Sequence, residues 1–203
     1  MARITEVEAL RQIYGHAKGR AVSKQMDRLD PHCRAFIALS PLVMLGSQGR
    51  DGPADVTPRG DGPGFVHVLD DRTLALPDRP GNNRLDTLVN ILENPRVGLL
   101  FLVPGIDEVL RVNGSAEIRD DDDLRAPFEV RGRLPATVLV VSVGEVYFHC
   151  AKALMRADMW NPARHVVRTV FPTIGEILRD QTGDGGGAES QAEMVARYRD
   201  LLY

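Results

Sequence analysis

A glycine, two asparagines and an arginine, Gly81-Asn82-Asn83-Arg84, stand directly before a segment with helical periodicity. Glycine leaves the backbone amides accessible, the amides and dipole at a helix start attract an anion, and a guanidinium adds a fixed pair of donors. This stretch therefore predicts a seat for a phosphate group. The alternative is an asparagine that caps the helix beside a solvated arginine, because asparagine is a preferred capping residue.

Two more arginines lie in segments that read as strands. Arg59 lies near the end of ADVTPRG, where nearby glycines would let a ligand approach the backbone, and Arg111 lies inside the apolar EVLRVNG. An unpaired guanidinium is costly in an apolar environment, so Arg111 is expected to meet an anion or a neutral acceptor. The alternative for Arg111 is a position on a solvated strand face.

A third cationic group follows the last predicted strand. Lys152, Arg156 and Trp160 recur every four residues in HCAKALMRADMWNP, so they would share one face if the segment is helical. Two cations and an indole on one stripe suit a planar anionic ligand. A solvated helix face with a core tryptophan would explain the same spacing.

The cysteines and histidines give no metal site. Two His-Cys pairs occur, His32-Cys33 and His149-Cys150, but neighbouring residues on a strand point to opposite faces, and no C-x-x-C spacing is present. Two cysteines also make no disulfide framework. We therefore expect two free thiols and no bound metal.

Short apolar segments separated by Gly, Pro and Asp must position these groups. They predict a mainly β (α+β) domain, a six-stranded antiparallel split β-barrel with flanking helices, because a doubly wound sheet would need a helix after each strand. We assign residues 1–30 to an N-terminal helical arm, 31–165 to the barrel domain and 166–203 to a C-terminal helical extension. Residues 84–94 predict a helix whose buried face would carry Leu85, Leu88, Val89 and Leu92.

Composition limits the function classes. The chain has 203 residues, a formal net charge of -3 and 43% hydrophobic residues, which is enough for a core and gives no basic surface for nucleic acid or an anionic membrane. The N-terminal segment has no apolar run of the signal-peptide kind. These features predict a cytoplasmic protein without a nucleic-acid or membrane partner.

Two predicted strands, VGLLFLV and TVLVVSV, are apolar at nearly every position. Such strands need both faces covered, and a barrel interior covers only one. The pattern predicts a symmetric homodimer.

Four segments in a fixed order carry a family resemblance: DVTPRGDGPGF, LALPDRPGNNRLDTLVNILENPRVGLLFLVPG, LRVNGSAEI and FHCAKALMRADMW. Together they resemble the pyridoxamine 5′-phosphate oxidase-like FMN-binding split-barrel superfamily, over roughly residues 30–165. NPRVGLLF is shared widely among split-barrel flavoproteins. PGNNRLDTLVNIL, LRVNG and CAKALMR are more specific to the bacterial group named "PPOX-class probable FMN-dependent enzyme".

The resemblance implies a dimer that binds one FMN in each of two grooves at its interface. It implies cofactor contacts from a set spread over five segments: Thr57, Pro58, Arg59, Gly60, Asp61, Leu76, Pro77, Asn82, Asn83, Arg84, Asn90, Arg111, Lys152, Arg156 and Trp160.

The resemblance also implies a part of the flavin for each segment. Residues 56–61 would follow the isoalloxazine edge and the ribityl chain, residues 76–77 would lie beside the ring, and residues 82–84 would hold the phosphate, with Asn90 near that end. Arg111 would reach the flavin. Lys152, Arg156 and Trp160 would come from the partner subunit and cover the cofactor.

The sequence departs from true pyridoxamine phosphate oxidases at two places. Those enzymes have a basic phosphate-binding pair before the helix and an Arg-Leu-x-Pro signature near the C-terminus, whereas this chain has GNNR and ends RYRDLLY. Oxidation of vitamin B6 is therefore not expected, and the sequence identifies no other substrate, electron donor or catalytic residue.

Three functions stay open on the sequence. The first is an FMN-dependent oxidoreductase, in which Arg111 or Lys152 would stabilise the reduced, anionic ring. The second is a protein that holds flavin, haem or a deazaflavin for storage, sensing or stress protection without turnover. The third is a catalytically silent dimeric scaffold.

Overall fold

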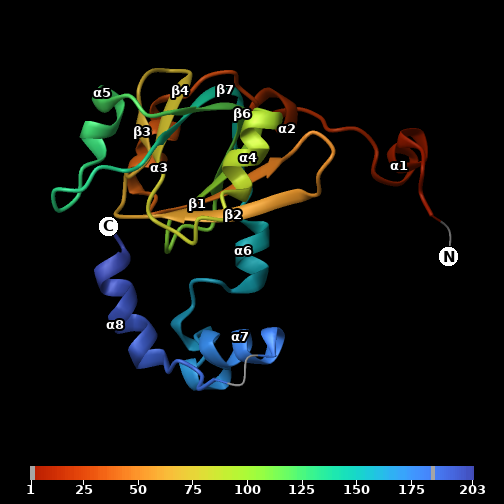
Figure 1. Ribbon diagram of the computed structural model, residues 1–203. Coiled ribbons are helices and arrows are strands. Elements are labelled where there is room, and N and C mark those ends of the chain that lie inside the picture. Colours follow the sequence, from red (N-terminus) through yellow and green to blue (C-terminus); the bar gives the residue numbers. More distant parts are fainter. Residues whose placement is uncertain (1–2, 184–185) are drawn as a thin grey trace.

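The computed structural model describes residues 3–183 and 186–203, and its centre is a strongly twisted antiparallel sheet with helices around it (Figure 1). The strands are β1 (Leu42–Gln48), β2 (Ala54–Gly60), β3 (His67–Val68), β4 (Thr73–Pro77), β5 (Arg96–Leu102), β6 (Val109–Arg119) and β7 (Val138–His149). The α-helices are α1 (Val7–Tyr14), α2 (Arg20–Ser23), α3 (Pro31–Leu39), α4 (Asp86–Glu93), α5 (Asp122–Arg125), α6 (Lys152–Ala157), α7 (Ile174–Thr182) and α8 (Gln191–Leu201). Short 3-10 turns lie at Ala126–Phe128, Pro162–Arg164 and Arg168–Val170.

The sheet has seven strands in the order β2-β1-β5-β6-β7-β4-β3, and every neighbouring pair is antiparallel. The mainly β, antiparallel prediction is confirmed, but the predicted count of six strands is wrong. The two-residue β3 pairs with β4 at one edge, and β2 forms the other edge, so the described strands make an open sheet. The sequence has seven apolar segments bounded by turn residues, including FVHVL before Asp70-Asp71, and the count of six left one of them out.

The longest strand pair, β6 with β7, contains a bulge at Asn113/Gly114. A Cβ added to Gly114 would lie 2.0 Å from the backbone oxygen of Ser142, so only glycine lets the two strands approach this closely. The bulge bends the longest pair and increases the local twist of the sheet.

The core lies on the inner face of the sheet, against α3 and part of α4. Pro31 begins α3 after Asp30, whose carboxylate accepts the Cys33 amide hydrogen at 2.8 Å, and this cap fixes the helix that covers the sheet. The buried side chains alternate with more exposed ones along β1 and β5. The largest fully buried side chains are Val43, Leu45, Leu74, Leu76, Phe101, Leu110, Val112, Val138, Leu139, Val141 and Val146, with Ile37 from α3.

The predicted buried face of α4 is wrong at three of its four residues, and only Leu88 packs against the core. Leu85, Val89 and Leu92 are exposed, at 51%, 48% and 76%, whereas Thr87 and Ile91 face the core and Leu88 is half-buried. Both stripes follow the helical period, and tertiary packing decided between them. An apolar stripe of α4 is therefore left on the surface of the single chain.

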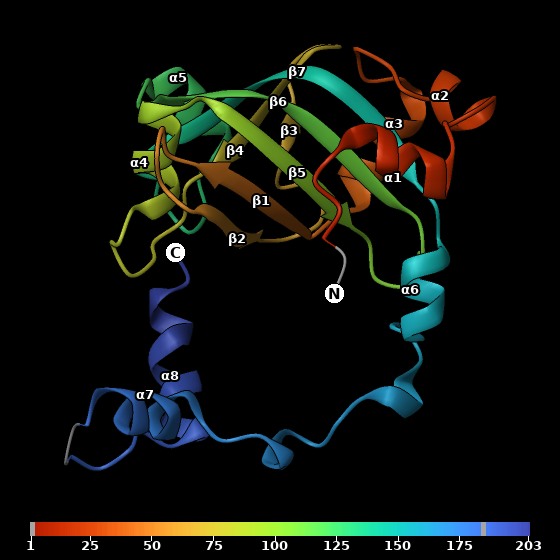
Figure 2. The same ribbon diagram turned by 90° about the vertical axis from the view of Figure 1, so that its right-hand side faces the viewer.

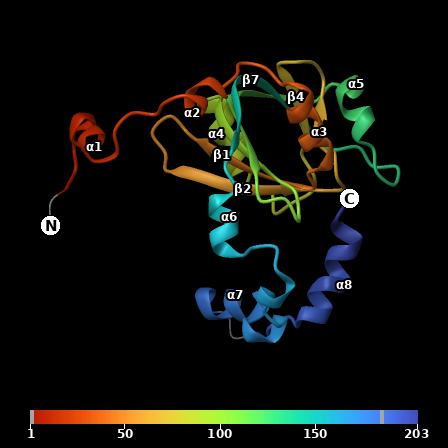
Figure 3. The same ribbon diagram turned by 180° about the vertical axis from the view of Figure 1, so that it is seen from behind.

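Both ends of the chain extend from the sheet. The N-terminal α1 stands apart from the body and carries exposed Val7, Leu10 and Ile13 (Figure 3). After β7 the chain leaves the sheet through α6, runs as an arc through α7, and turns back along α8 so that its end lies beside the sheet again (Figure 2). Capping boxes at Thr173 and Ser190 begin α7 and α8.

No helix in the described part of the chain combines the length and apolar composition needed to cross a bilayer.

Candidate functional site

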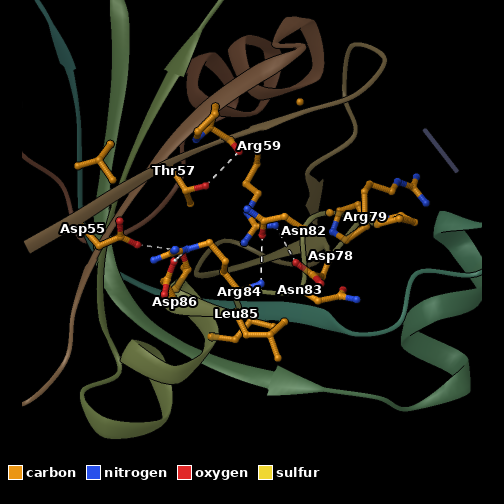
Figure 4. Close-up of a pocket in the computed structure, with 18 of the residues that line it drawn as sticks. Asp55, Thr57, Arg59, Asp78, Arg79, Asn82, Asn83, Arg84, Leu85 and Asp86 are labelled. Carbon is orange, nitrogen blue, oxygen red and sulfur yellow. Dashed lines mark hydrogen bonds and ion pairs between the residues drawn. The ribbon is translucent and has the colours of Figure 1, made fainter. Parts of the chain in front are cut away.

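A cavity of about 500 Å³ opens between β2, the segment from Pro77 to Leu85, and the first turn of α4 (Figure 4). Eight of the predicted cofactor residues line it: Thr57, Pro58, Arg59, Gly60, Pro77, Asn82, Asn83 and Arg84. Segments about twenty residues apart in the sequence are thus brought to one site. The volume lies within the range of roughly 300–1,000 Å³ found for small-molecule sites.

Two reciprocal ion pairs join the walls of this cavity. Arg59 on β2 donates to Asp78 at 2.7 Å, and Arg79 on the opposite wall donates to Asp61 at 2.8 Å. All four side chains are mostly buried, with exposed fractions between 9% and 22%. Because each wall supplies one cation and one anion, the two pairs fix the spacing of the walls.

Arg59 has one unused donor. Its Nε atom is buried and has no hydrogen-bond partner among the described residues. A buried unpaired donor is costly unless a ligand satisfies it, so this atom marks a place for an acceptor in the cavity wall.

The entrance to α4 has an unusual backbone. Asn83 has φ 57° and Leu85 has φ 61°, in the left-handed region that residues other than glycine rarely adopt. Leu85 is the N-cap residue and gives the first turn no side-chain acceptor. The N-cap therefore leaves first-turn amides of α4 without a side-chain acceptor, which is the condition under which a helix start can bind an anion. The alternative of an asparagine cap is therefore not observed.

Asn82 and Arg84 instead organise the turn before the helix. The Asn82 side-chain oxygen accepts the Arg84 amide hydrogen at 3.1 Å, and the Arg84 guanidinium donates to Asp86 at 2.8 Å. The Arg84–Asp86 pair is exposed, so solvent weakens it and an incoming phosphate could replace Asp86 as the partner of Arg84.

The carboxylate of Asp61 is held in its charged form. Burial alone would raise its pKa, but hydrogen bonds from Tyr203, the Gly62 amide and Arg79 outweigh this effect, and the pKa lies below its usual value. Asp61 is not among the residues that line the cavity, but it holds Arg79, which lines the cavity.

Six other predicted residues lie outside this cavity. Leu76 is buried in the core, and the Asn90 side chain donates to Ser47 at 3.1 Å. The Arg111 guanidinium lies over the Tyr147 ring, 5.1 Å from its centroid, a cation–π contact that differs from the anion or acceptor predicted from the sequence.

Lys152, Arg156 and Trp160 are on the segment after β7. The helix α6 ends at Ala157, followed by Asp158 in the left-handed conformation, so Trp160 does not continue the helical stripe that the spacing predicted. Its indole donates to the Ile106 backbone oxygen at 2.9 Å, whereas Lys152 and Arg156 are exposed. The chain does not bring these three residues to its own cavity.

Several lining residues were not predicted: Asp55, Phe65, Asp78, Arg79, Leu85, Asp86 and Thr87. The sequence signal for two of them was Pro77-Asp78-Arg79-Pro80, in which an acidic and a basic residue stand between two prolines. Asp55 could be found only from the fold, because its carboxylate meets the Thr87 hydroxyl at 3.2 Å across the cavity.

Residues 29–150, more than half of the chain, match the family described as "Pyridoxamine 5′-phosphate oxidase". The chain belongs to this family. The match contains the sheet, α3, α4 and the whole cavity, and it ends where the C-terminal segment begins.

Several solved structures resemble this chain. A variant of HupZ from Group A Streptococcus shares the fold with a TM-score of 0.50 at 18% identity, over 59% of this chain and 98% of that one. General Stress Protein 26 of Bacillus anthracis matches at 0.41 and 18% identity, over 58% and 93%. An F420 reductase matches at 0.39 and 18% identity, over 57% and 94%. No curated protein matches the sequence significantly.

Proposed function

We propose that this member of the pyridoxamine 5′-phosphate oxidase family binds FMN in the cavity between β2 and α4. The observation that carries the proposal is the left-handed turn at Asn83 and Leu85, which leaves an uncapped helix start beside the Arg84 guanidinium. Backbone strain of this kind persists where the surrounding structure holds it for a function. A phosphate at this turn would meet amides, a helix dipole and a cation together.

The rest of the cavity suits the remainder of FMN. The unused Arg59 Nε offers a donor on the β2 wall, and residues 56–60 present an extended backbone along which a ring and its ribityl chain would lie. Pro77 and Phe65 add apolar surface for the isoalloxazine. We assign the phosphate to residues 82–84 and the ring to the β2 side.

The activity that we propose is that of a flavin-dependent oxidoreductase in a homodimer. Bound flavin supplies hydride acceptance and donation, and the protein supplies orientation and charge. Lys152, Arg156 and Trp160 lie away from the cavity of their own chain, and we assign them to the cavity of the partner. A dimer would also cover Leu100 and Leu102 of β5, which are only half-buried in the single chain.

A second candidate is a protein that holds flavin, haem or a deazaflavin without turnover. The described residues that line the cavity include no histidine, the side chain that most often transfers protons in enzymes, and their only carboxylates are those of Asp55, Asp78 and Asp86. Anaerobic mixing of the FMN-loaded protein with NADH or NADPH separates the two candidates. Bleaching of the flavin band by either donor supports an oxidoreductase, whereas a stable band with both favours storage.

The phosphate assignment is tested with Arg84→Ala. Loss of a charge-assisted hydrogen bond should weaken FMN by about 1.5–3 kcal/mol, or roughly tenfold to a hundredfold in Kd. Riboflavin, which has no phosphate, should bind wild type and variant equally. Titration calorimetry with both ligands measures the difference.

The control for this test is Arg50→Ala, which removes an exposed arginine outside the cavity. It should leave both affinities unchanged. Equal losses of FMN and riboflavin in Arg84→Ala would show that Arg84 is not the phosphate partner. Absence of FMN binding by the wild-type protein would refute the proposed function itself.

A further inference from the structure

Tyr203 returns from the end of α8 to the wall of the cavity. Its phenol donates to Asp61 Oδ1 at 2.6 Å, and its ring centroid lies 5.3 Å from the Arg79 guanidinium. The Arg131 guanidinium lies 5.5 Å from the centroid of the same ring, and Arg133 donates to the Tyr203 main-chain oxygen. The Tyr203 side chain thus contacts one carboxylate and lies near two guanidinium groups.

Asp61 and Arg79 are the second of the two ion pairs that join the cavity walls. Asp61 directly follows β2, and Arg79 belongs to the segment that leads to Asn82 and Arg84. Arg79 also donates to the Phe128 backbone oxygen at 2.8 Å, so its guanidinium is held from two sides before Tyr203 is counted. The phenol adds a third constraint, on the carboxylate that Arg79 contacts.

The arrangement orients the pair as well as stabilising it. Asp61 Oδ1 accepts from Tyr203 and from the Gly62 amide, whereas Oδ2 accepts from Arg79. With both donors on Oδ1, Oδ2 is left to point at the Arg79 Nε. Removing the phenol would remove one of the two donors that set this rotamer.

The segment that carries Tyr203 is long and far away in sequence. It departs from the sheet through α6 (Figure 2). At the start of α7, the Thr173 hydroxyl donates to the Glu189 backbone oxygen. The Glu189 carboxylate accepts from Arg197 of α8, so Glu189 joins the two helices. Tyr203 brings the end of this helical unit against the cavity wall. A conformational change in α7 or α8 can therefore alter the cavity wall through the Tyr203 side chain.

We propose that Tyr203 is a positioning residue of the FMN cavity, which acts through Asp61 and Arg79 to hold the segment from Asp78 to Leu85 in its binding conformation. The inference rests on the proposed function, since it assigns a role in the same site. Without the phenol, the wall that carries Asn82, Asn83 and Arg84 samples more open conformations, and the phosphate seat is formed for a smaller fraction of the time.

The experiment compares Tyr203→Phe and Tyr203→Ala with wild type. Tyr203→Phe keeps the ring among the arginines and removes only the hydrogen bond, so it should fold normally. The control is Tyr198→Ala, which removes an exposed tyrosine of α8 whose ring contacts Arg197. Hydrogen exchange of the amides in residues 78–85 is measured without flavin, and FMN affinity is measured by titration.

We expect faster exchange in residues 78–85 for Tyr203→Phe and faster still for Tyr203→Ala, with the Tyr198→Ala rate equal to wild type. FMN affinity should fall about threefold to tenfold in Tyr203→Phe, the effect of one lost hydrogen bond. A merely structural role of the C-terminal helices would lower stability without a change confined to this segment.

The two proposals fail in different ways. If wild type binds FMN and both Tyr203 variants keep wild-type exchange and affinity, the positioning role is wrong and the proposed function stands. If wild type does not bind FMN but the exchange of residues 78–85 still increases in both variants, the proposed function is wrong, and Tyr203 orders this wall without serving FMN.

Discussion

At the scale of single residues, the cavity is built from charges that compensate one another. Arg59 with Asp78 and Asp61 with Arg79 cross the same gap in opposite directions, so each wall contributes one cation and one anion to the two pairs. Removal of one member of a mostly buried ion pair leaves the other charge without a partner. The loss in free energy of unfolding should therefore exceed the net stabilisation that the intact pair provides. Arg84 differs from these arginines because it is exposed and free to change its partner.

The lowered pKa of Asp61 gives a pH dependence. A carboxyl whose pKa is lower in the folded state than in the unfolded chain stabilises the fold above its unfolded pKa, here near 3.8, and loses this contribution as the pH falls through the folded value. At pH 7, Asp61→Asn should lower the free energy of unfolding by about 1.5–3 kcal/mol, through loss of a charged hydrogen-bond acceptor.

The difference between wild type and Asp61→Asn should shrink as the pH falls below about 4 and through the lower pKa of folded Asp61, because wild-type Asp61 then becomes neutral as well. Urea unfolding at several pH values measures it. Asp51→Asn, which changes an exposed aspartate outside the cavity lining, is the control and should be close to wild type throughout. A difference that does not change with pH would contradict the role of the Asp61 charge.

At the scale of elements, α4 combines a strained entrance with an exposed apolar stripe. Its N-cap residue, Leu85, holds a left-handed conformation in which a branched side chain is disfavoured, and that side chain is half exposed. This strained residue follows Arg84 directly and lines the cavity. Strained backbone clusters at ligand-binding sites, so the position of Leu85 agrees with a binding role.

Substitution of Leu85 should reveal this strain. Leu85→Gly removes the free-energy cost of about 1–2 kcal/mol that a side chain adds in the left-handed conformation. Glycine also makes the unfolded chain more flexible, which offsets part of this gain. The variant should therefore be as stable as wild type or up to roughly 1 kcal/mol more stable. Leu85→Val should be destabilised by about 1 kcal/mol or more, because a β-branched residue tolerates this conformation least.

Leu92→Gly provides the comparison within the same helix. Leu92 is more exposed than Leu85 but has ordinary helical geometry, so glycine there should cost about 1 kcal/mol. Thermal unfolding of the three variants measures the order. If Leu85→Gly lost as much stability as Leu92→Gly, the left-handed turn would not be strained.

At the scale of the whole molecule, the cavity is flanked by surface that one chain leaves uncovered. Val56, Leu85 and Val89 are exposed at or beside it, and Lys152 and Arg156 project from α6 without reaching it. A two-fold dimer would bury the first group and bring the second to the partner's cavity, because an isologous interface applies the same contact twice.

This arrangement predicts complementation between damaged subunits. Each cavity would take its phosphate seat from one chain and its cover from the other, so a heterodimer of Arg84→Ala and Arg156→Ala subunits would contain one doubly damaged site and one intact site. FMN should then bind tightly at about half occupancy, which follows from the two-fold symmetry. Each homodimeric variant should show only weakened sites.

Native mass spectrometry can confirm the heterodimer and count its bound flavins in one measurement. Confirmed heterodimers without any tight site would show that Arg84 and Arg156 serve the same cavity, or that Arg156 serves none. A protein that stays monomeric at micromolar concentration with FMN bound, measured by light scattering, would contradict the dimer.

The sequence by itself determined the features that depend on short stretches of chain. The apolar segments separated by turn residues were enough for an antiparallel, mainly β domain, and Gly81-Asn82-Asn83-Arg84 was enough to locate the candidate anion seat, because backbone and side chain cooperate there within four residues. The motif order was enough for the family. The expectation for Arg59 was local in the same sense, since it rests on a strand end among glycines, and the structure places Arg59 in the cavity lining.

Tertiary structure alone decided which of two apolar stripes of α4 is buried, since both Leu85-Val89-Leu92 and Thr87-Ile91 satisfy the same helical period. It also decided that α6 stops before Trp160, through a left-handed residue that no spacing reveals. The Asp61–Arg79 pair spans 18 residues and its contact with Tyr203 spans 142. Residues this far apart in the sequence come into contact only when the whole chain folds, and hydrophobic periodicity does not predict which of them meet.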